Sequence, residues 1–336
     1  MDWFEKLTGF REGAYEETRA RLEVTGGRLR SRENGSGWRI GTLELVSLES
    51  LRARAHAARL PGLLRVSMVE GDVRRLHRHA ENAGALFQVA SQFNLLEMVS
   101  PSVTPEDGVA RYERDYTQGP ACAIAAGAAT IYRNYFTPMN GGSGQTATRQ
   151  IDTLACLGAA LSRALRRPLS KLWRMRNGYA LLTESGLAAI SSHIQGLPEA
   201  ERDTLRGKLC IGLHQDVEVT DAEGPERPVV SQAFCSALPV SYCGLHGAPW
   251  QPFASLVLEA AYEATLWAAV VNAERGASRR VFLTLLGGGA FGNDPAWILA
   301  AMHRALTLAE NFGLDVRIVS YGPPSAGLLA LEDDLC

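Results

Sequence analysis

Residues 283–294 read LTLLGGGAFGND, an apolar run that ends in three consecutive glycines and continues into Ala290, Phe291 and a fourth glycine. This pattern predicts a buried strand, a tight turn and the start of a helix. Glycines let main-chain N–H groups approach an anion, and the amino end of a helix carries partial positive charge. A phosphate-binding loop is one interpretation and a structural turn is the other. The stretch is neither GxGxxG nor a Walker loop, so the two commonest nucleotide motifs are absent.

The composition is that of an ordinary globular protein. The chain has 336 residues, of which 46% are hydrophobic and 21% are charged, and its formal net charge is -2. This charge gives no reason to expect a nucleic-acid partner. We also expect no membrane partner, because no apolar stretch reaches about 18 residues. The amino terminus lacks a secretory apolar core, which predicts a cytoplasmic location, although specialised secretion into another cell stays compatible. Six scattered cysteines suggest neither a zinc site nor a disulfide framework.

Strand and helix patterns alternate along most of the chain. This alternation predicts an α/β fold, a three-layer α/β/α sandwich with a mixed central sheet, in which ligands bind beyond the carboxyl ends of strands. The pattern also predicts one long helix over 121–136. The expected organisation is a helical N-terminal extension at 1–60, a main domain at 61–325 with a helical insertion at about 140–225, and a C-terminal tail at 326–336.

Polar residues follow two of the expected strands. Asp72 ends VEGDV, where its carboxylate can accept from an exocyclic amine or cap a helix. Asn94 ends ALFQVASQFN, where its amide can hydrogen-bond a ribose hydroxyl or serve a turn. A helix start with Pro120 near its first turn comes later, and three residues ahead of it can offer donors to a phosphate: Thr117, Gln118 and Gly119.

Taken together, these blocks resemble the macrodomain superfamily, whose members bind or hydrolyse ADP-ribose. VEGDV at 69–73, FQVASQFN at 87–94 and LLGGGAFGN at 285–293 occur in the family's order, and the last resembles the Gly-Ala-Phe-Gly run of poly(ADP-ribose) glycohydrolases. With YTQGPACAIAAGAATIYRNY and GQTATRQID, the set is most similar to the MavL-type hydrolases, which remove ADP-ribose from arginine of ubiquitin. The resemblance covers about 60–322. It departs from ordinary macrodomains in the first loop, which is rich in acids and has no Gly-Gly-Gly-Val run.

The resemblance implies a role for each candidate. Asp72 would bind the adenine and Asn94 the distal ribose, against which Phe291 would pack. Backbone N–H groups would hold the diphosphate, so no metal and no cofactor are expected, and ADP-ribose is the ligand and product. The residues expected to wrap the diphosphate in the second loop are Gly287, Gly288, Gly289, Ala290 and Gly292.

The acid-rich loop after Asn94 supplies the catalytic candidates. Cleavage of an N-glycosidic bond needs a carboxylate that stabilises an oxocarbenium-like transition state and orients or deprotonates water. Asp115 is the first choice because it precedes the expected helix start, Asp107 in a PEDG turn is the second, and Glu106 is the third. Glu97 follows the strand so closely that a buried structural role stays open.

The resemblance therefore implies an ADP-ribosyl-protein hydrolase that cleaves mono-ADP-ribose from a protein side chain, with arginine the first choice and ubiquitin the leading partner. A non-catalytic ADP-ribose reader and a hydrolase of another linkage are the alternatives. The acid-rich loop favours an enzyme, because carboxylates repel a diphosphate and a reader has no need of them. In GGSGQTATRQID, Gln145, Thr146 and Arg149 contact the ligand or substrate in one interpretation, and a helix cap explains the segment in the other.

Overall fold

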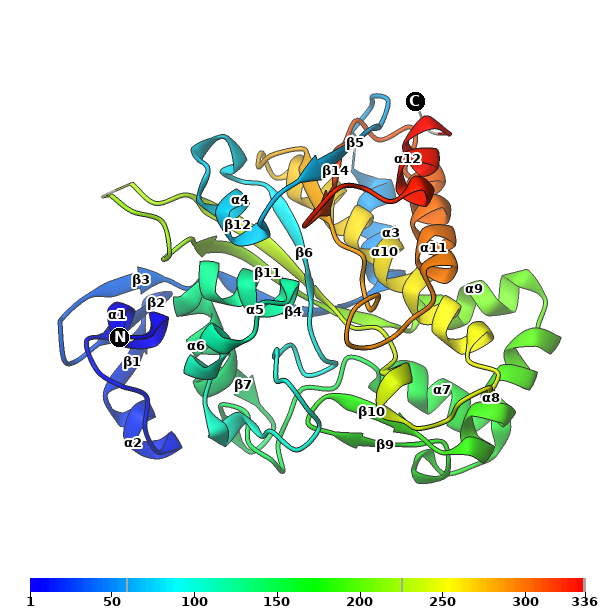
Figure 1. Ribbon diagram of the computed structural model, residues 1–336, viewed down its shortest axis with the longest axis horizontal. Coiled ribbons are helices and arrows are strands. Elements are labelled where there is room, and N and C mark those ends of the chain that lie inside the picture. The colour runs from blue at the N-terminus through cyan, green and yellow to red at the C-terminus, as the bar shows by residue number, and fades with distance from the viewer. Residues whose placement is uncertain (59, 225, 335–336) are drawn as a thin grey trace.

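The computed structural model describes residues 1–58, 60–224 and 226–334, and a seven-stranded sheet forms its centre (Figure 1). The strand order is β4-β11-β12-β6-β13-β14-β5. The last five strands of this order run parallel to one another, whereas β11 is antiparallel to both β4 and β12. The strands are β4 (Thr42–Ser47), β5 (Arg65–Glu70), β6 (Leu86–Ala90), β11 (Cys210–Glu218), β12 (Val229–Cys235), β13 (Arg280–Leu283) and β14 (Asp315–Ser320).

Helices cover both faces of this sheet, which confirms the predicted three-layer α/β/α sandwich with a mixed sheet. The layer around α10 comprises α3 (Leu48–Ala57), α8 (Glu184–Gly196), α9 (Glu199–Gly207), α10 (Gln251–Glu274), α11 (Pro295–Leu308) and α12 (Ala326–Asp333). The opposite layer comprises α1 (Trp3–Thr8), α4 (Val73–Arg78), α5 (Gln118–Ala125) and α6 (Gly127–Tyr135). By length and composition α10 passes as a membrane span, but 83% of its most apolar window is buried inside the protein, as in a core helix.

The order of connections creates a crevice at the centre of the sheet. The neighbouring parallel strands β6 and β13 lead to helices in opposite layers, because the chain after β6 reaches α5 and the chain after β13 reaches α11. The two loops therefore separate as they leave the sheet. In open α/β sheets, such a point outside the carboxyl ends of the strands is where ligands bind.

The N-terminal segment differs from the expected helical extension. It contains α1 and α2 (Tyr15–Ala20), but also a three-stranded sheet of β1 (Leu22–Thr25), β2 (Arg28–Ser31) and β3 (Gly37–Arg39). The expected boundary at residue 60 does not coincide with an edge of the sandwich, since β4 pairs with β11 and α3 packs on α10. These partners lie more than 150 residues away in the chain, beyond the reach of a local pattern.

The expected insertion is helical only in part. It contains α7 (Ala155–Leu165), α8 and α9, but also the hairpin of β9 (Trp173–Arg176) and β10 (Tyr179–Leu182), and the short pair β7 (Pro138–Met139) and β8 (Gly142–Ser143). The segment ends before residue 225, because β11 already belongs to the central sheet. At the other end of the chain, most of the expected tail is α12, which packs on β5 and α11.

The predicted long helix over 121–136 is broken into α5 and α6 at Ala126. The N–H of Gly127 donates to the Thr220 hydroxyl over 2.9 Å in place of continuing the helix. A Cβ at Gly127 would lie 2.7 Å from the ring of Trp3, so the break also lets α1 approach closely. The remaining single turns are 3-10 helices: η1 (Ala80–Asn82), η2 (Pro105–Asp107), η3 (Ala110–Arg114), η4 (Leu169–Lys171) and η5 (Val240–Tyr242).

Candidate functional site

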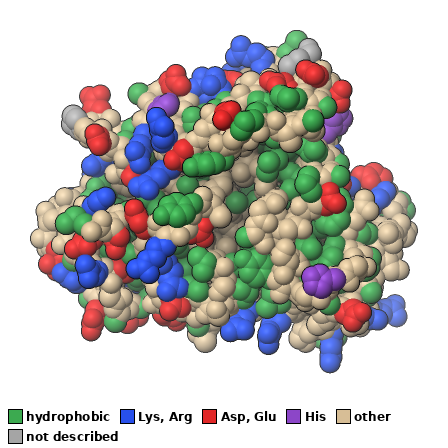
Figure 2. Space-filling view, viewed as in Figure 1, with side chains coloured by type: hydrophobic (Ala, Val, Ile, Leu, Met, Phe, Trp, Pro, Cys, Tyr) green, Lys and Arg blue, Asp and Glu red, His purple; other side chains and the backbone are tan. Residues whose placement is uncertain are grey.

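A pocket opens at the carboxyl ends of β6 and β13, at the crevice described above. Figure 2 shows that this face of the molecule is hollowed near its middle and that hydrophobic side chains gather around the hollow. Three segments and three further residues line the pocket: parts of 90–99, 115–120 and 284–291, with Tyr179, Ala237 and Tyr242. We call the lining residues of 284–291 the glycine wall and those of 90–120 the acid wall.

Two glycines fix the path of the loop that carries the glycine wall. Gly287 and Gly292 adopt φ values of 77° and 69°, in the left-handed region that favours glycine. A Cβ at Gly292 would clash with the hydroxyl oxygen of Ser241, and one at Gly287 would lie 2.5 Å from the Cβ of Ala237. Gly289, by contrast, has open space where a side chain would stand. The loop therefore packs closely against the 237–241 segment at both ends, and its backbone is accessible in the middle.

Both walls present backbone N–H groups that are not used by the protein. Within the described part of the chain, the N–H groups of Gln118 and Gly119 at the start of α5 donate to no protein atom, and neither do those of four residues of the glycine wall: Gly287, Gly289, Ala290 and Phe291. All six residues line the pocket. No lysine or arginine is among the described lining residues. The pocket therefore offers an anion main-chain dipoles and a helix amino terminus in place of cationic side chains.

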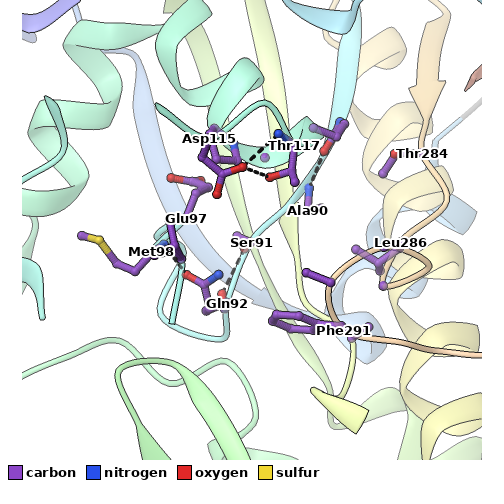
Figure 3. A pocket seen from close by; sticks show the side chains of 18 of the residues that line it. Ala90, Ser91, Gln92, Glu97, Met98, Asp115, Thr117, Thr284, Leu286 and Phe291 are labelled. Atoms are coloured by element: carbon purple, nitrogen blue, oxygen red, sulfur yellow. Dashed lines mark hydrogen bonds between the residues drawn. The ribbon is translucent and has the colours of Figure 1, made fainter. Parts of the chain in front are cut away.

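The acid wall carries two carboxylates. Asp115 lies just before α5, where its Oδ1 accepts from the N–H of Thr117 over 2.9 Å and from the Thr117 hydroxyl over 2.7 Å. These bonds leave Oδ2 without a protein donor among the described residues. Figure 3 shows Asp115 and Glu97 on the same side of the pocket, across from Phe291 and Leu286. The protein thus places negative charge beside a cluster of anion-binding donors.

Glu97 forms part of the pocket floor and is 2% exposed. Its Oε1 lies 3.5 Å from Nη2 of the equally buried Arg133, and its Oε2 has no partner. Burial raises the pKa of Glu97 to about 7, against the opposing effect of the Arg133 charge. A buried acid with a free oxygen beneath a pocket is typical of a functional site rather than of a purely structural ion pair.

Arg133 also fixes the loop that carries Glu97. Its Nε donates to the carbonyl of Leu95 over 3.2 Å, and its guanidinium stacks on the ring of Phe234 at 3.9 Å. Leu95 has a φ of 64°, which is strained for a leucine. One buried arginine therefore holds both the strained residue and the acid two positions later.

The β9–β10 hairpin supports the same loop from outside. Its turn residue Gly178, with a φ of 78°, accepts from the N–H of Phe93 over 3.0 Å. Its first β10 residue, Tyr179, donates its hydroxyl to the carbonyl of Met98 over 2.6 Å. The inserted segment thus braces the acid wall, a role that its own sequence does not reveal.

Three aromatic rings close one side of the pocket. Tyr179, Tyr242 and Phe291 contact one another with ring centroids 5.1–5.7 Å apart. All three line the pocket. Such a cluster offers ring faces and edges against which a sugar or base can pack.

The structure brings together the predicted residues Asp115, Thr117, Gln118, Gly119 and four members of the second loop. Gly288 and Gly292 of that loop do not line the pocket, and their N–H groups are used within the loop, donating to Leu285 and Gly289. Their expected contact with the diphosphate is therefore replaced by a role in shaping the loop. The Gln118 side chain is also used internally, since it accepts from Ala90 and donates to Gln88.

Asp72 and Asn94 do not line the pocket. Asp72 caps α4 by accepting the Arg74 N–H over 2.8 Å. Asn94 is fully buried, donates to Gln150 and accepts from the N–H of Leu96. Its amide is thus committed to the turn, which is the alternative that the sequence leaves open. Gln92, two residues earlier, lines the pocket in its place.

Glu106 and Asp107 also lie away from the pocket. Both carboxylate oxygens of Glu106 accept from the N–H of Ala147. Asp107 accepts from the N–H and hydroxyl of Thr104 in a capping box. These bonds make both acids part of the loop structure. The candidates of the loop at 141–152 are likewise used by the protein itself: Arg149 donates to the carbonyls of Gly141, Ser143 and Gly144, Thr146 pairs with Arg149, and Gln145 donates to the carbonyls of Asn94 and Arg133.

Sequence reasoning missed the pocket-lining roles of Gln92, Glu97 and Tyr179. Gln92 lies in the quoted strand block, and its position two residues before Asn94 was the available signal. Glu97 shows its significance only through burial and Arg133, which lies 36 residues further along the chain. Tyr179 comes from the insertion, and no local pattern links it to a loop 81 residues earlier.

Among the described residues, no group of three or more His, Cys, Asp or Glu side chains is placed to hold a metal ion. No protein-family model and no curated protein matches the chain. Solved structures that it resembles include a poly(ADP-ribose) glycohydrolase from Thermomonospora curvata, at 15% identity and a TM-score of 0.45, covering 92% of this chain and 94% of that one. Another is the poly(ADP-ribose) glycohydrolase from Deinococcus radiodurans in complex with ADP-ribose, at 15% identity and a TM-score of 0.43, covering 87% and 92%. Both TM-scores lie below 0.5, so the function proposed next rests on the pocket itself.

Proposed function

We propose that this protein is an ADP-ribosyl hydrolase that binds ADP-ribose in the central pocket and cleaves mono-ADP-ribose from a protein side chain, arginine first. The observation that carries the proposal is the pairing of free N–H donors on both walls with two carboxylates on one of them. Donors without cationic side chains suit a diphosphate. Carboxylates near a diphosphate repel it and weaken its binding, so a catalytic role explains their presence better than a binding role.

The proposed ligand spans the crevice. The diphosphate lies between the amino end of α5 and the middle of the glycine wall, where six N–H groups lack protein partners. The distal ribose packs on Phe291 and takes a hydrogen bond from Gln92, whose Oε1 is occupied by the N–H of Met98 and whose Nε2 is not bonded by a described protein group. We assign the adenine to the side toward Asp72, which uses only Oδ1 to cap α4.

Asp115 is the proposed catalytic carboxylate. As the bond between the ribose anomeric carbon and the guanidino nitrogen breaks, its electron pair leaves with the nitrogen and positive charge develops on the ribose. The free oxygen of Asp115 stabilises that charge and accepts a proton from the attacking water, whose oxygen bonds to the anomeric carbon. Asp115 then returns that proton to the departing guanidine, which leaves as the guanidinium of arginine, and the carboxylate is regenerated. The products are ADP-ribose and the unmodified side chain.

We propose that Glu97 contributes negative charge from the floor of the pocket. It is too buried to be the residue that meets water first, but an ionised carboxylate in a low-dielectric floor stabilises a cationic transition state across a short distance. Because the pKa of Glu97 is raised to about 7, the carboxylate becomes ionised as the pH rises through neutrality. We therefore expect the rate to increase over that range.

The arginine linkage and ubiquitin as acceptor rest on the sequence resemblance described above. Purified protein incubated with arginine-ADP-ribosylated ubiquitin tests both, with free ADP-ribose and intact ubiquitin followed by mass spectrometry. Release of ADP-ribose with intact ubiquitin supports the hydrolase. Tight binding of ADP-ribose without release from this substrate would contradict the arginine linkage and favour a reader or a hydrolase of another linkage.

A further inference from the structure

The mouth of the pocket is unusually apolar. Nine large hydrophobic side chains are exposed among the described residues. Two of them, Val99 at 49% and Leu285 at 38% exposure, line the pocket on opposite walls, and a third, Tyr116 at 92%, lies between the lining residues Asp115 and Thr117. Single exposed apolar residues are ordinary, but a cluster around a binding site marks an interaction surface.

Tyr116 is the most exposed of the three and does not line the pocket. Its two neighbours, Asp115 and Thr117, both line it and are joined by hydrogen bonds. These hydrogen bonds between its two neighbours hold the backbone at Tyr116, whose side chain is exposed to solvent. A large ring held out by a fixed backbone loses little conformational freedom on binding, which suits an interface anchor.

The bound nucleotide does not explain these side chains. Phosphates and riboses are polar and are proposed to lie deeper, against free N–H groups. The group that leaves, however, must pass Asp115 and therefore the adjoining Tyr116. A free amino acid is too small to cover apolar groups on both walls at once, whereas the surface of a folded protein can cover Val99, Tyr116 and Leu285 together.

We propose that Val99, Tyr116 and Leu285 form a docking ring for the acceptor protein, and that the acceptor presents its ADP-ribosylated side chain from an apolar patch of a folded surface. This inference rests on the proposed function and adds the class of substrate to it. The ring gives affinity for the protein part and leaves the chemistry at the nucleotide unchanged.

The test compares two substrates, arginine-ADP-ribosylated ubiquitin and free ADP-ribosyl-arginine, in wild type and in Tyr116→Ser. We expect the variant to raise KM for the protein substrate by about tenfold, which corresponds to roughly 1.4 kcal/mol, and to hydrolyse ADP-ribosyl-arginine like wild type. Tyr116→Phe should behave as wild type on both, because the ring and not the hydroxyl makes the contact. Tyr321→Ser is the matched control, since Tyr321 is 86% exposed and neither it nor its neighbours Ser320 and Gly322 line the pocket.

Three results overturn the inference. If Tyr116→Ser changes the hydrolysis of both substrates equally, Tyr116 acts on the nucleotide or on the chemistry. If the variant changes the hydrolysis of neither substrate, the docking ring does not contribute to binding of the acceptor protein. In both cases hydrolysis by wild type leaves the proposed function intact. If wild type hydrolyses neither substrate, the proposed function fails and the docking ring fails with it.

Discussion

The two walls of the pocket differ in how they are built and in what they offer. The glycine wall is a single short loop with no charged side chain in the lining, shaped by Gly287 and Gly292 and bare at Gly289. The acid wall is assembled from distant parts of the chain, with Glu97 held by Arg133 in α6 and the loop braced by the β9–β10 hairpin. The comparison teaches that anion binding needs only backbone geometry, whereas placing carboxylates beside that anion requires support from several elements.

The largest expected effect comes from the acid wall. Asp115→Asn keeps an oxygen that accepts from Thr117 but removes the negative charge, so we expect ADP-ribose release to fall by about 100- to 1,000-fold, the usual range for loss of one group that stabilises a transition state. ADP-ribose affinity should change by less than about tenfold. Mass spectrometry of the products and calorimetry of binding measure the two quantities. Normal turnover in this variant would remove Asp115 from the mechanism.

The next effect concerns stability. The pKa of Glu97 is raised from 4.5 to about 7 by burial, so the folded protein binds more protons than the unfolded chain over this window. That contribution is fully present below about pH 4.5 and is lost as the pH rises through 7. Relative to Glu97→Gln, the wild-type free energy of unfolding should therefore fall by about 3 kcal/mol between about pH 4 and about pH 8.

Denaturant unfolding of both proteins across this pH range measures the difference. The buried histidines His77 and His214, whose pKa values are lowered by burial, titrate in both proteins and cancel in the subtraction. A difference that is flat with pH would show that the pKa of Glu97 is not raised in the folded protein. In that case the rate of wild type should also lack its rise near neutral pH.

A smaller effect tests the glycine wall. Gly292→Ala introduces a Cβ that clashes with Ser241 at a left-handed backbone position, so the loop must shift. We expect ADP-ribose affinity to fall by about tenfold, or roughly 1.4 kcal/mol. Gly196→Ala is the matched control, because Gly196 does not line the pocket, its Cβ would meet open space and its backbone needs no left-handed φ. Equal affinities for the two variants would mean that the loop does not hold the ligand.

The smallest effect separates the pocket acids from the other acids of the same loop. Asp107→Asn and Glu106→Gln alter carboxylates that bind loop N–H groups and do not line the pocket. ADP-ribose release should stay within about twofold of wild type, a change of under 0.5 kcal/mol. A loss comparable to that of Asp115→Asn would indicate that the loop closes over the ligand and brings Asp107 to the ribose, as the sequence alone suggests.

The contrast between the glycine wall and the acid wall also explains which parts of the structure can be predicted from the sequence. The strand, turn and helix around 283–308 follow from adjacent residues, and so does the placement of Asp115 and Thr117 at a helix start. The α/β/α sandwich could be predicted because alternating strands and helices leave few alternative folds, and the structure confirms it. Asn94 and Asp72 show the limit of this approach. Their strand-end positions are compatible with both binding and turn chemistry, and only their partners distinguish the two.

Long-range contacts account for the rest. The burial of Glu97 depends on Arg133 and on the packing of α6, and the pairing of β4 with β11 joins segments that are distant in the chain. Neither leaves a periodic trace in the local sequence. The sequence ranks Asp115, Asp107 and Glu106 as candidates and leaves a structural role open for Glu97, but it does not reveal that burial makes Glu97 very different from the other three.

The central claim is that both walls hold one diphosphate between them. Calorimetric titration of the wild-type protein with ADP-ribose and, separately, with AMP tests it most directly. AMP has a single phosphate and no distal ribose, so it can engage the donors of both walls only in part. The account predicts that ADP-ribose binds at least about tenfold more tightly than AMP. Equal affinities, or no binding of ADP-ribose, would contradict it.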